Sequence, residues 1–387
     1  MKNLGNDLQQ RKAQHLYRSR RISEGPQQPE MVIDGRPVIS FCSNDYLGLA
    51  NHPEVKAAFI RGAEKYGVGS GAAHLINGHS RAHHALEEEL AGYTGYPRTL
   101  LFSTGYMANL GVAQALAGRG DSVLEDRLNH ASLLDGGLLS GARLMRYRHN
   151  DSNDLTEKLV SRNQGDKLVL SDGVFSMDGD IADIAGLVSA CNNHDAMLMI
   201  DDAHGFGVLG RNGRGSLEHA GVSPADVPLY MATLGKALGT AGAFVAGSEE
   251  LIETLIQQAR TYIYTTASPP AVAEATRASL AVIQSSPQLR QQLDDNIRYF
   301  RNCCNQTGVE LTDSQTAIQP VIIGETQTTV EASEQLLAQG ILITAIRPPT
   351  VAEGTARLRI TLSAVHSRSH IDKLVSVLKI IPPSDAR

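Results

Sequence analysis

Met197-Leu198-Met199-Ile200-Asp201 is a run of four apolar residues that ends in a carboxylate. Similar short apolar runs occupy residues 99–103, 121–124, 167–171, 229–233 and 243–246, and helical patterns separate them. Strands that are apolar on both faces and alternate with helices are typical of a parallel sheet covered by helices. The middle of the chain is therefore predicted to be an α/β domain with a mostly parallel central sheet.

The polar residues at the ends of these runs are the first candidates for a functional site. In open α/β sheets, ligands bind beyond the carboxyl ends of the parallel strands. Position alone therefore selects Ser103, Ser171, Asp201 and Thr233.

The pattern changes on both sides of this domain. After residue 285 it follows the order helix, strand, helix, strand, strand, helix, over residues 289–304, 317–324, 328–339, 341–346, 356–362 and 368–381. This order predicts a smaller C-terminal α+β domain over 286–387. The polar, Arg-rich start carries the breaks Gly25-Pro26 and Gly35-Arg36-Pro37, which suit an N-terminal arm over 1–44. The large domain then spans 45–285.

Composition excludes several classes of protein. The chain has 387 residues, 42% hydrophobic and 20% charged, which is typical of a globular protein of two or three domains. Lys and Arg number 35 against 41 Asp and Glu, and the net charge of −6 argues against a nucleic-acid or membrane partner. No apolar run has the length of a membrane span or the pattern of a signal sequence, so we expect a cytoplasmic protein. The four cysteines form no Cys-x-x-Cys motif and are expected to be reduced.

One glycine motif is set aside. Gly205-Phe206-Gly207-Val208-Leu209-Gly210 matches Gly-x-Gly-x-x-Gly, but Asp202-Ala203-His204 separates it from the preceding strand. Asn212-Gly213-Arg214-Gly215 follows where a dinucleotide site needs a helix. The Gly-x-Ser-x-Gly, His-Glu-x-x-His and Walker signatures do not occur in the sequence.

Two clusters of basic residues are ambiguous. His79, His83 and His84 place two imidazoles one helical turn apart, but no Cys or third ligand lies nearby. A polar helix face is the simpler interpretation, and we expect no metal site. Arg18 stands in a second cluster, with two more arginines close behind it, that is either a solvated surface or a site for an acidic ligand.

A lysine among glycines follows another predicted strand. The sequence there is Thr233-Leu234-Gly235-Lys236-Ala237-Leu238-Gly239, and Asp201-Asp202-Ala203-His204 ends the strand before it. A Schiff-base enzyme needs such a lysine, room for a planar aldehyde cofactor and a carboxylate for the ring nitrogen. The alternative is a surface lysine in a turn. Phe102-Ser103-Thr104-Gly105-Tyr106 adds a strand-to-helix turn whose free N–H groups suit a phosphate dianion. Together these features indicate pyridoxal 5'-phosphate.

Several blocks of sequence, in the same order along nearly the whole chain, resemble those of the α-oxoamine synthases. These fold type I pyridoxal-phosphate transferases condense an amino acid with an acyl thioester and release carbon dioxide. The blocks are Ser43-Asn44-Asp45-Tyr46-Leu47-Gly48-Leu49, Asn129-His130-Ala131-Ser132, Gly173-Val174-Phe175-Ser176-Met177-Asp178-Gly179-Asp180, Asp201-Asp202-Ala203-His204-Gly205 and Thr233-Leu234-Gly235-Lys236.

The resemblance implies roles around the cofactor ring. Lys236 is similar to the lysine that binds the cofactor and later removes the α-proton of the amino acid, and Asp201 matches the partner of the ring nitrogen. His130 matches the imidazole that stacks on the ring and adjoins the substrate. His204 and Ser176 match groups near the phenolic oxygen of the ring. Lys236, His130, Asp201 and His204 are therefore the expected catalytic residues.

The same resemblance implies the phosphate ligands and a second subunit. Gly105 and Tyr106 match the backbone on the phosphate side of the cofactor, and Thr233 matches a phosphate ligand just before the lysine. Thr266 looks like a hydroxyl that the neighbouring subunit donates to the phosphate. A homodimer is therefore expected.

The substrate side is also implied by resemblance. Arg359 and Asn44 resemble the pair that holds the amino acid carboxylate, and Arg18 and Thr350 match positions on the acyl side. The C-terminal signature over 345–363 resembles that of the biotin-pathway member, which joins L-alanine to a pimeloyl thioester of coenzyme A or an acyl carrier protein.

Two departures from the family pattern affect mainly the acyl preference. Asp172 stands where relatives generally carry a glutamate, and the segment 69–78 is less glycine-rich than usual, with Ala72 and Ala73 at positions that often hold Gly and Ser. The alternatives are a sister activity of the glycine C-acetyltransferase type, an aminotransferase on the same fold, and a non-catalytic pyridoxal-phosphate binding protein.

Overall fold

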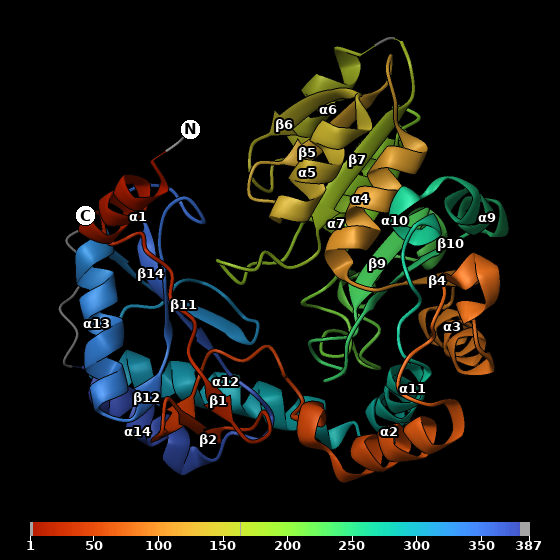
Figure 1. The fold of residues 1–387 in the computed structure, drawn as a ribbon. Helices are drawn as coiled ribbons and strands as arrows, with labels where there is room; N and C mark the ends of the chain where they lie inside the picture. The colour runs from red at the N-terminus through yellow and green to blue at the C-terminus, as the bar shows by residue number, and fades with distance from the viewer. Residues whose placement is uncertain (1–2, 163, 380–387) are drawn as a thin grey trace. The chain divides into compact units, whose positions relative to one another are not determined.

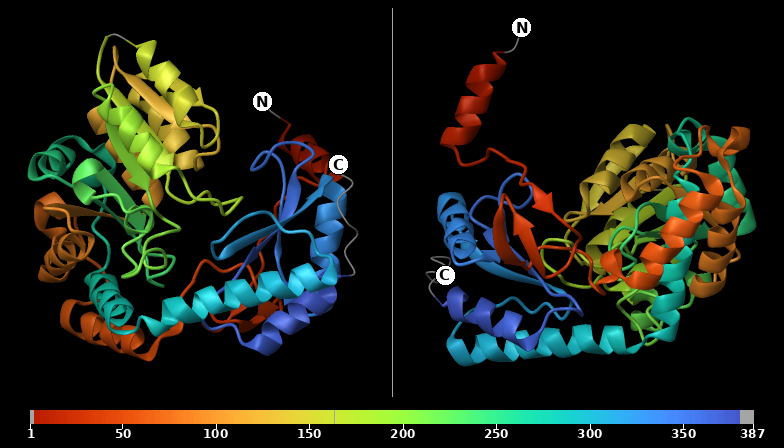
Figure 2. Two further views of the ribbon diagram at one scale, coloured as in Figure 1. Left: turned by 180° about the vertical axis from the view of Figure 1, so that it is seen from behind. Right: turned by 60° about the horizontal axis from the view of Figure 1, so that its bottom comes forward.

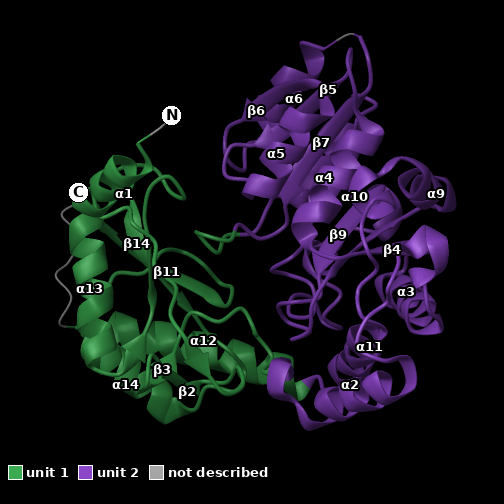
Figure 3. Cartoon of the chain, in the orientation of Figure 1, with its two compact units in different colours: residues 1–48, 176–180, 288–387 green, residues 49–175, 181–287 purple. Residues whose placement is uncertain are grey.

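The structure is a computed structural model that describes residues 3–162 and 164–379. The described residues form two compact units (Figure 3). Unit 1 contains the residues through Gly48, the short segment Ser176–Asp180 and the residues from Gln288 onward. Unit 2 contains Leu49–Phe175 and Ile181–Pro287.

Unit 2 is built on a seven-stranded sheet in the order β4-β10-β9-β8-β7-β5-β6 (Figure 1). The strands from β9 to β6 are parallel to their neighbours, and β10 is antiparallel to both β4 and β9. The prediction of a mostly parallel α/β sheet is confirmed. The strands are β4 (Arg98–Phe102), β5 (Ser122–Asp126), β6 (Arg143–Tyr147), β7 (Lys167–Asp172), β8 (Met197–Asp201), β9 (Leu229–Thr233) and β10 (Ala243–Gly247).

Helices flank this sheet in unit 2. Helix α4 (Gly105–Leu116) packs Ala108, Val112 and Ala113 into a buried core with Met199 of β8 and Met231 of β9. These small and β-branched side chains bring the helix close to the strands, so its N-terminus lies near their carboxyl ends. The other helices are α2 (Pro53–Tyr66), α3 (Arg81–Thr94), α5 (Ala131–Ser140), α6 (Ser152–Val160), α7 (Ile184–Asn192), α8 (Ser216–Ala220), α9 (Glu249–Gln258), α10 (Arg260–Ile263) and α11 (Pro270–Ser285), with a π-helical turn over His74–Gly78 and 3-10 turns over Leu49–Asn51 and Pro224–Asp226.

Unit 1 contains two small sheets. The first has the order β1-β2-β3-β12, and the second has the order β11-β14-β13. Figure 2 shows the long helix α12 lying alongside α14 in this unit. The strands are β1 (Ser23–Glu24), β2 (Glu30–Ile33), β3 (Arg36–Ser40), β11 (Ile318–Gly324), β12 (Ile341–Leu342), β13 (Thr344–Ile346) and β14 (Ala356–Thr361), and the helices are α1 (Leu4–Ala13), α12 (Gln288–Thr307), α13 (Thr326–Ala338) and α14 (Arg368–Leu378).

Three details differ from the expected elements. The single strand expected over 341–346 is divided, because β12 pairs with β3 while β13 pairs with β14 in the other sheet. The edge strand β6 was not expected, since Arg143 and Arg146 are exposed on it and break the apolar pattern. The helix expected to reach residue 381 is described only as far as Leu378, and residues 380 and 381 lie outside the described residues.

Pairing of β3 with β12 joins the N-terminal strands to the C-terminal part of the chain in unit 1. The N-terminal arm or small segment expected over 1–44 stays a prediction. Among the described residues, no helix combines the length and the apolar composition needed to cross a membrane.

Candidate active site

Lys236 and His204 meet beyond the carboxyl ends of two neighbouring parallel strands of unit 2. Asp201, the last residue of β8, is in register with Met231 of β9. The segments that follow these two strands contain His204 and Lys236. Lys236 Nζ lies 2.9 Å from His204 Nε2, and the lysine is only half-exposed. A hydrogen bond between an amine and an imidazole lets a proton be shared or passed between the two nitrogens.

Asp201 is buried, at 4% exposure, and its carboxylate is fixed by two donors. Asn109 of α4 donates from Nδ2 to Oδ2 at 2.7 Å, and the backbone N–H of Ala203 donates to Oδ1 at 3.0 Å. Hydrogen bonds to both oxygens set the direction of this carboxylate. Sequence reasoning missed Asn109 because it lies 92 positions away from Asp201 in the chain.

His130 is connected to the same network through Ser132. Its Nδ1 lies 2.7 Å from Ser132 Oγ, and that oxygen accepts a hydrogen bond from Asn109 Nδ2 at 2.8 Å. Although the His130 side chain remains accessible to solvent, desolvation by the surrounding chain lowers its pKa, and nearby Lys236 lowers that pKa further against the opposing effect of Asp201. The imidazole is therefore biased toward its neutral form.

Asp172 holds the backbone next to His130. The N–H of His130 donates to Asp172 Oδ2 at 2.7 Å, and the N–H of Asp172 donates to Asn129 Oδ1 at 3.0 Å. Burial and nearby Asp201 raise the pKa of Asp172 well above its usual value. The Asp172 side chain therefore has a local role, because it fixes the turn that places His130 at the start of α5.

The N-terminus of α4 offers an anion site. Thr104 caps the helix by accepting from the Met107 N–H at 3.2 Å, which leaves the N–H groups of Gly105 and Tyr106 among the unsatisfied donors of the first turn. A Cβ at Gly105 would lie 2.7 Å from Thr233 Cγ2, so only glycine allows this close approach. In the part of the chain that the structure describes, Thr233 Oγ1 is buried and has no hydrogen-bond partner. A phosphate group would supply the missing acceptor and use the helix N-terminus.

Two further expected cofactor residues, Tyr106 and Thr266, are exposed. Tyr106 is exposed, and its hydroxyl donates to Asp135 Oδ2, while its backbone stands in the first turn of α4. Thr266 is exposed and forms an isolated antiparallel bridge with Ala73. The exposed Thr266 hydroxyl is available to a second chain.

Arg359, Asn44 and Ser176 come together within unit 1. The guanidinium of Arg359, 7% exposed on β14, donates from Nε to the Ser176 carbonyl at 2.5 Å and from one terminal nitrogen to Asn44 Oδ1 at 3.2 Å. The same nitrogen donates to Thr361 Oγ1 at 3.1 Å. The buried Tyr46 hydroxyl donates weakly to Asn44 Oδ1 at 3.5 Å, and burial raises the pKa of Tyr46 to about 12. The guanidinium is thus held in a fixed plane, as recognition of a carboxylate requires.

Arg18 and Thr350 also meet in unit 1. A terminal nitrogen of Arg18 lies 3.5 Å from Thr350 Oγ1, and both residues line a cavity of about 500 Å³. Arg347 lines the same cavity and donates to the Tyr17 carbonyl at 2.6 Å. Desolvation and the charge of Arg18 lower the pKa of Arg347, which marks a positive environment at this cavity. Its lining includes apolar residues of the β12–β13 region such as Leu342 and Ile343.

Comparison with known proteins places the chain in a family. The model of the family described as aminotransferase class I and II matches residues 36–378. An 8-amino-7-oxononanoate synthase from Thioalkalivibrio sulfidiphilus is 62% identical over 98% of this chain and 97% of its own. The chain belongs to the 8-amino-7-oxononanoate synthase family, within the class I and II aminotransferases. The resemblance to this group of enzymes seen in the sequence is confirmed.

Solved structures agree with this assignment to the 8-amino-7-oxononanoate synthase family. A synthase of that name from Francisella tularensis matches with a TM-score of 0.77 at 32% identity, over 89% of this chain and 97% of that chain. A serine palmitoyltransferase from S. paucimobilis, with a bound PLP–myriocin aldimine, matches with a TM-score of 0.92 at 31% identity, over 98% of this chain and 96% of that chain. The predicted fold type I architecture is confirmed.

Proposed function

We propose that this chain joins L-alanine to a pimeloyl thioester, giving 8-amino-7-oxononanoate, carbon dioxide and the free thiol, with pyridoxal 5'-phosphate as cofactor. The thiol is that of coenzyme A or an acyl carrier protein. The observation that carries this proposal is the Lys236–His204 contact of 2.9 Å beside the buried Asp201. A relative that is 62% identical over 98% of the chain and bears the name of this synthase supports the choice of substrates.

The residues of unit 2 fit the cofactor. Its phosphate would lie at the N-terminus of α4, where Gly105 leaves room and the buried Thr233 hydroxyl has no partner within the described chain. Asp201 would accept from the ring nitrogen, and Lys236 would bind the aldehyde carbon. Bound in this way, the cofactor supplies an electron sink that stabilises negative charge at the amino acid α-carbon.

Lys236 and His204 would carry out proton transfer between the Lys236 amine and the imidazole. The lysine must lose its proton to act as nucleophile and base, and His204 Nε2, 2.9 Å away, is placed to hold that proton. His130, held by Ser132 and kept mainly neutral, would cover one face of the ring and adjoin the substrate. Ser176 would contribute its hydroxyl near the phenolic oxygen.

Arg359 and Asn44 would bind the carboxylate of L-alanine. The guanidinium is already oriented by the Ser176 carbonyl and by Asn44, so little rotamer freedom remains to be lost on binding. On the acyl side, Arg18 and Thr350 would contact the pimeloyl thioester, and the apolar lining residues of their cavity of about 500 Å³ suit a methylene chain. The positive charge at the cavity suits the distal carboxylate of such a chain.

We further propose a homodimer in which Thr266 of each chain reaches the phosphate site of the other. Its exposed hydroxyl supports this, since the side chain is open to a second subunit. The cytoplasmic location stays a prediction.

The substrate assignment is tested by thiol release from pimeloyl-coenzyme A. The cofactor-loaded protein is offered L-alanine, glycine and L-serine in separate reactions, and the product is identified by mass. We expect release with L-alanine alone, together with 8-amino-7-oxononanoate. Release with another amino acid, or only with a shorter or longer acyl thioester, contradicts the assignment and indicates a sister activity.

A further inference from the structure

A second cluster of titratable side chains lies in unit 2, on α3 and the turn before it. His74 stands at the start of the π-helical turn, His79 follows that turn, and His83 and His84 occupy the first turn of α3. The sequence alone showed no third ligand type for these imidazoles. In the structure Glu87, one helical turn after His84 on α3, turns toward the same place.

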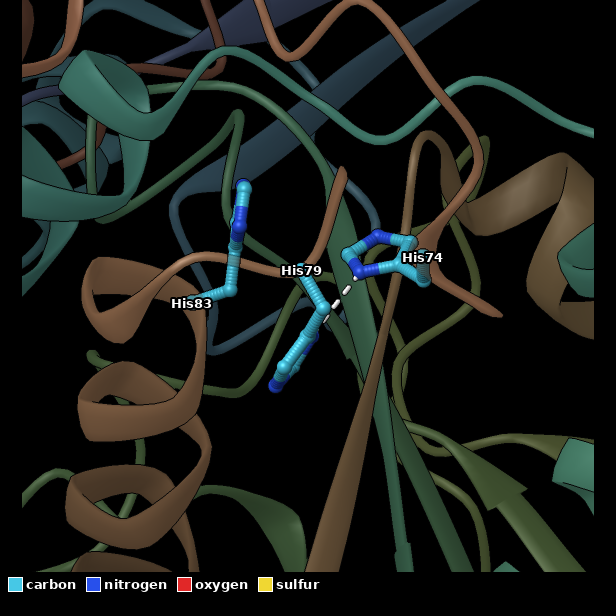
Figure 4. Close-up of side chains that lie close together, drawn as sticks. All are labelled: His74, His79 and His83. Carbon is cyan, nitrogen blue, oxygen red and sulfur yellow. Dashed lines mark hydrogen bonds between the residues drawn. The ribbon is translucent and has the colours of Figure 1, made fainter. Parts of the chain in front are cut away.

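His83 has a structural role, because both of its ring nitrogens are already hydrogen-bonded. The backbone N–H of Ser80 donates to its Nδ1 at 3.1 Å, so that nitrogen carries a lone pair, and its Nε2 lies 2.8 Å from the Ser268 carbonyl, which requires an N–H there. Both ring nitrogens are therefore used in capping α3 and fixing the segment around Ser268. Figure 4 shows no hydrogen bond from the His83 ring to the other two rings. This imidazole is structural.

His79 is held in one orientation by His74. Their Nδ1 atoms lie 3.0 Å apart (Figure 4), so one of the two carries the hydrogen and the other accepts it. The His74 ring stacks on Tyr262 with centroids 5.1 Å apart, which fixes its plane. With His79 as the donor, the other nitrogen of His79, Nε2, keeps its lone pair.

The Nε2 atom of His79 faces a carboxylate. His79 Nε2 lies 3.8 Å from Glu87 Oε2, and the Glu87 side chain is only 14% exposed. The other oxygen of Glu87 accepts from the Leu101 N–H at 3.0 Å, which fixes the carboxylate. One ligand atom from each of His79, His84 and Glu87 lies within 4.8 Å of the other two.

The three side chains also share a space. They line a cavity of about 290 Å³, which is large enough for an ion with bound water. Arg98 lines this cavity as well, but it pairs with Glu249 at 2.5 Å and with Glu253 at 3.1 Å. Its positive charge is therefore compensated from outside the cluster.

We propose that His79, His84 and Glu87 bind a divalent transition-metal ion of the Zn²⁺ class, with His74 as the positioning residue. Two imidazoles and a carboxylate form a ligand set that Zn²⁺ accepts, with water in the remaining position. Ligand bonds of about 2.0–2.1 Å place the ligand atoms of a tetrahedral site about 3.4 Å apart, so the His79–Glu87 pair needs only a small adjustment. A metal-bound imidazole that donates its other N–H to a fixed acceptor is the usual arrangement, and His74 provides that acceptor.

The test is metal binding by the cofactor-loaded full chain. Zn²⁺ is titrated in competition with a chromophoric chelator, and Co²⁺ is used separately for its ligand-field absorption. We expect a single tight Zn²⁺ per chain and a tetrahedral Co²⁺ spectrum. The variant E87Q, which keeps the hydrogen bond to Leu101, is expected to weaken binding by more than about a hundredfold, and H74A by about ten- to a hundredfold.

Two controls keep the result specific. H219A removes an exposed histidine of α8 and should leave the affinity unchanged. K236A should also leave it unchanged, because the metal would not lie on the cofactor site. Absence of tight binding in the wild type, or equal affinity in the wild type, E87Q and H84A, would overturn the proposal. Circular dichroism of each variant separates loss of ligands from loss of fold.

Discussion

The side chains around Lys236 form a chain of hydrogen bonds whose middle member is an amide. Asn109 Nδ2 donates to both Asp201 and Ser132, at 2.7 and 2.8 Å, and Ser132 in turn contacts His130. One amide therefore orients both the carboxylate that would face the ring nitrogen and the imidazole that would cover the ring.

Asn109→Ala should impair the orientation of Asp201 and His130 without preventing attachment of the cofactor to Lys236. Loss of a hydrogen bond to a charged group costs about 1.5–3 kcal/mol, so we expect kcat to fall by about ten- to a hundredfold while the protein still binds the cofactor through Lys236. Steady-state kinetics and the cofactor absorption spectrum measure the two effects. N192A, at an exposed position of α7, is the matched control. A variant N109A with wild-type kcat would contradict the positioning role.

His366 gives a pH dependence to stability. Its Nδ1 accepts from the Ser363 N–H and its Nε2–H donates to the Ser40 carbonyl, both at 2.9 Å, and burial lowers its pKa from 6.5 to about 4. Between these values the unfolded chain binds a proton that the folded chain does not. Stability is therefore complete above about pH 6.5 and falls with decreasing pH, by about 1.4 kcal/mol per pH unit from this residue.

Urea unfolding followed by circular dichroism, near pH 7 and near pH 5, checks this dependence. H366Q removes the titrating group and should reduce the loss of unfolding free energy on acidification. An equal loss in wild type and H366Q would show that His366 is not responsible.

Three residues of the candidate site could be selected from the sequence. Lys236, Asp201 and His204 stand next to predicted strand ends, so the position of the sheet fixes where they go. Asn109 and Glu87 were not found, because each acts on a partner in another element and has no distinctive local pattern.

At the scale of elements, the turn that follows β9 determines where Lys236 points. Gly239 has φ +65°, and a Cβ there would lie 2.2 Å from the backbone nitrogen of Ala50. Gly235, on the other side of the lysine, is open: its nearest neighbour would be the Thr240 carbonyl oxygen at 3.4 Å.

Substitution by alanine at these two glycines should give opposite results. G239A introduces a side chain at positive φ against rigid backbone, and we expect a loss of about 3 kcal/mol or more of unfolding free energy. G235A should change stability by less than about 1 kcal/mol. Thermal unfolding measured side by side checks the difference. Equal stability of the two variants would mean that the close approach at Gly239 does not constrain the turn.

The elements of the sheet were predicted well where both faces are buried and poorly at edges. β7, β8 and β9 are buried along nearly their whole length and apolar in their central residues, so the hydrophobic pattern identifies them. β6 and the β12–β13 division depend on which partner strand is available, and local sequence contains no information about a partner that is far away in the chain.

At the scale of the whole molecule, the proposed dimer makes a prediction about mixed subunits. If Thr266 serves the site of the partner, the K236A and T266A chains are complementary, since a mixed dimer has one site with both Lys236 and Thr266. T266A alone should bind the cofactor about ten- to a hundredfold more weakly. Mixing and refolding the two variants should restore tight binding to one site per dimer. No recovery in dimers shown to be mixed would place Thr266 on its own chain's site or outside it.

The composition of the two units includes contacts that the sequence pattern does not predict. The pattern changes near residue 285 and α12 begins at Gln288, whereas the pairing of β3 with β12 is a long-range contact that composition does not reveal. Assembly of the site residues of unit 1 around Arg359 depends on the same kind of contact, over 315 positions to Asn44.

Lys236 is proposed to carry the cofactor beside Asp201 and His204. Borohydride reduction of the cofactor-loaded protein, followed by peptide mapping, tests this attachment. We expect the cofactor to become fixed to the peptide that contains Lys236, and K236A to lose the label while the exposed-lysine control K56A retains it. A label on another lysine, or an unchanged label in K236A, would rule out Lys236 as the attachment site.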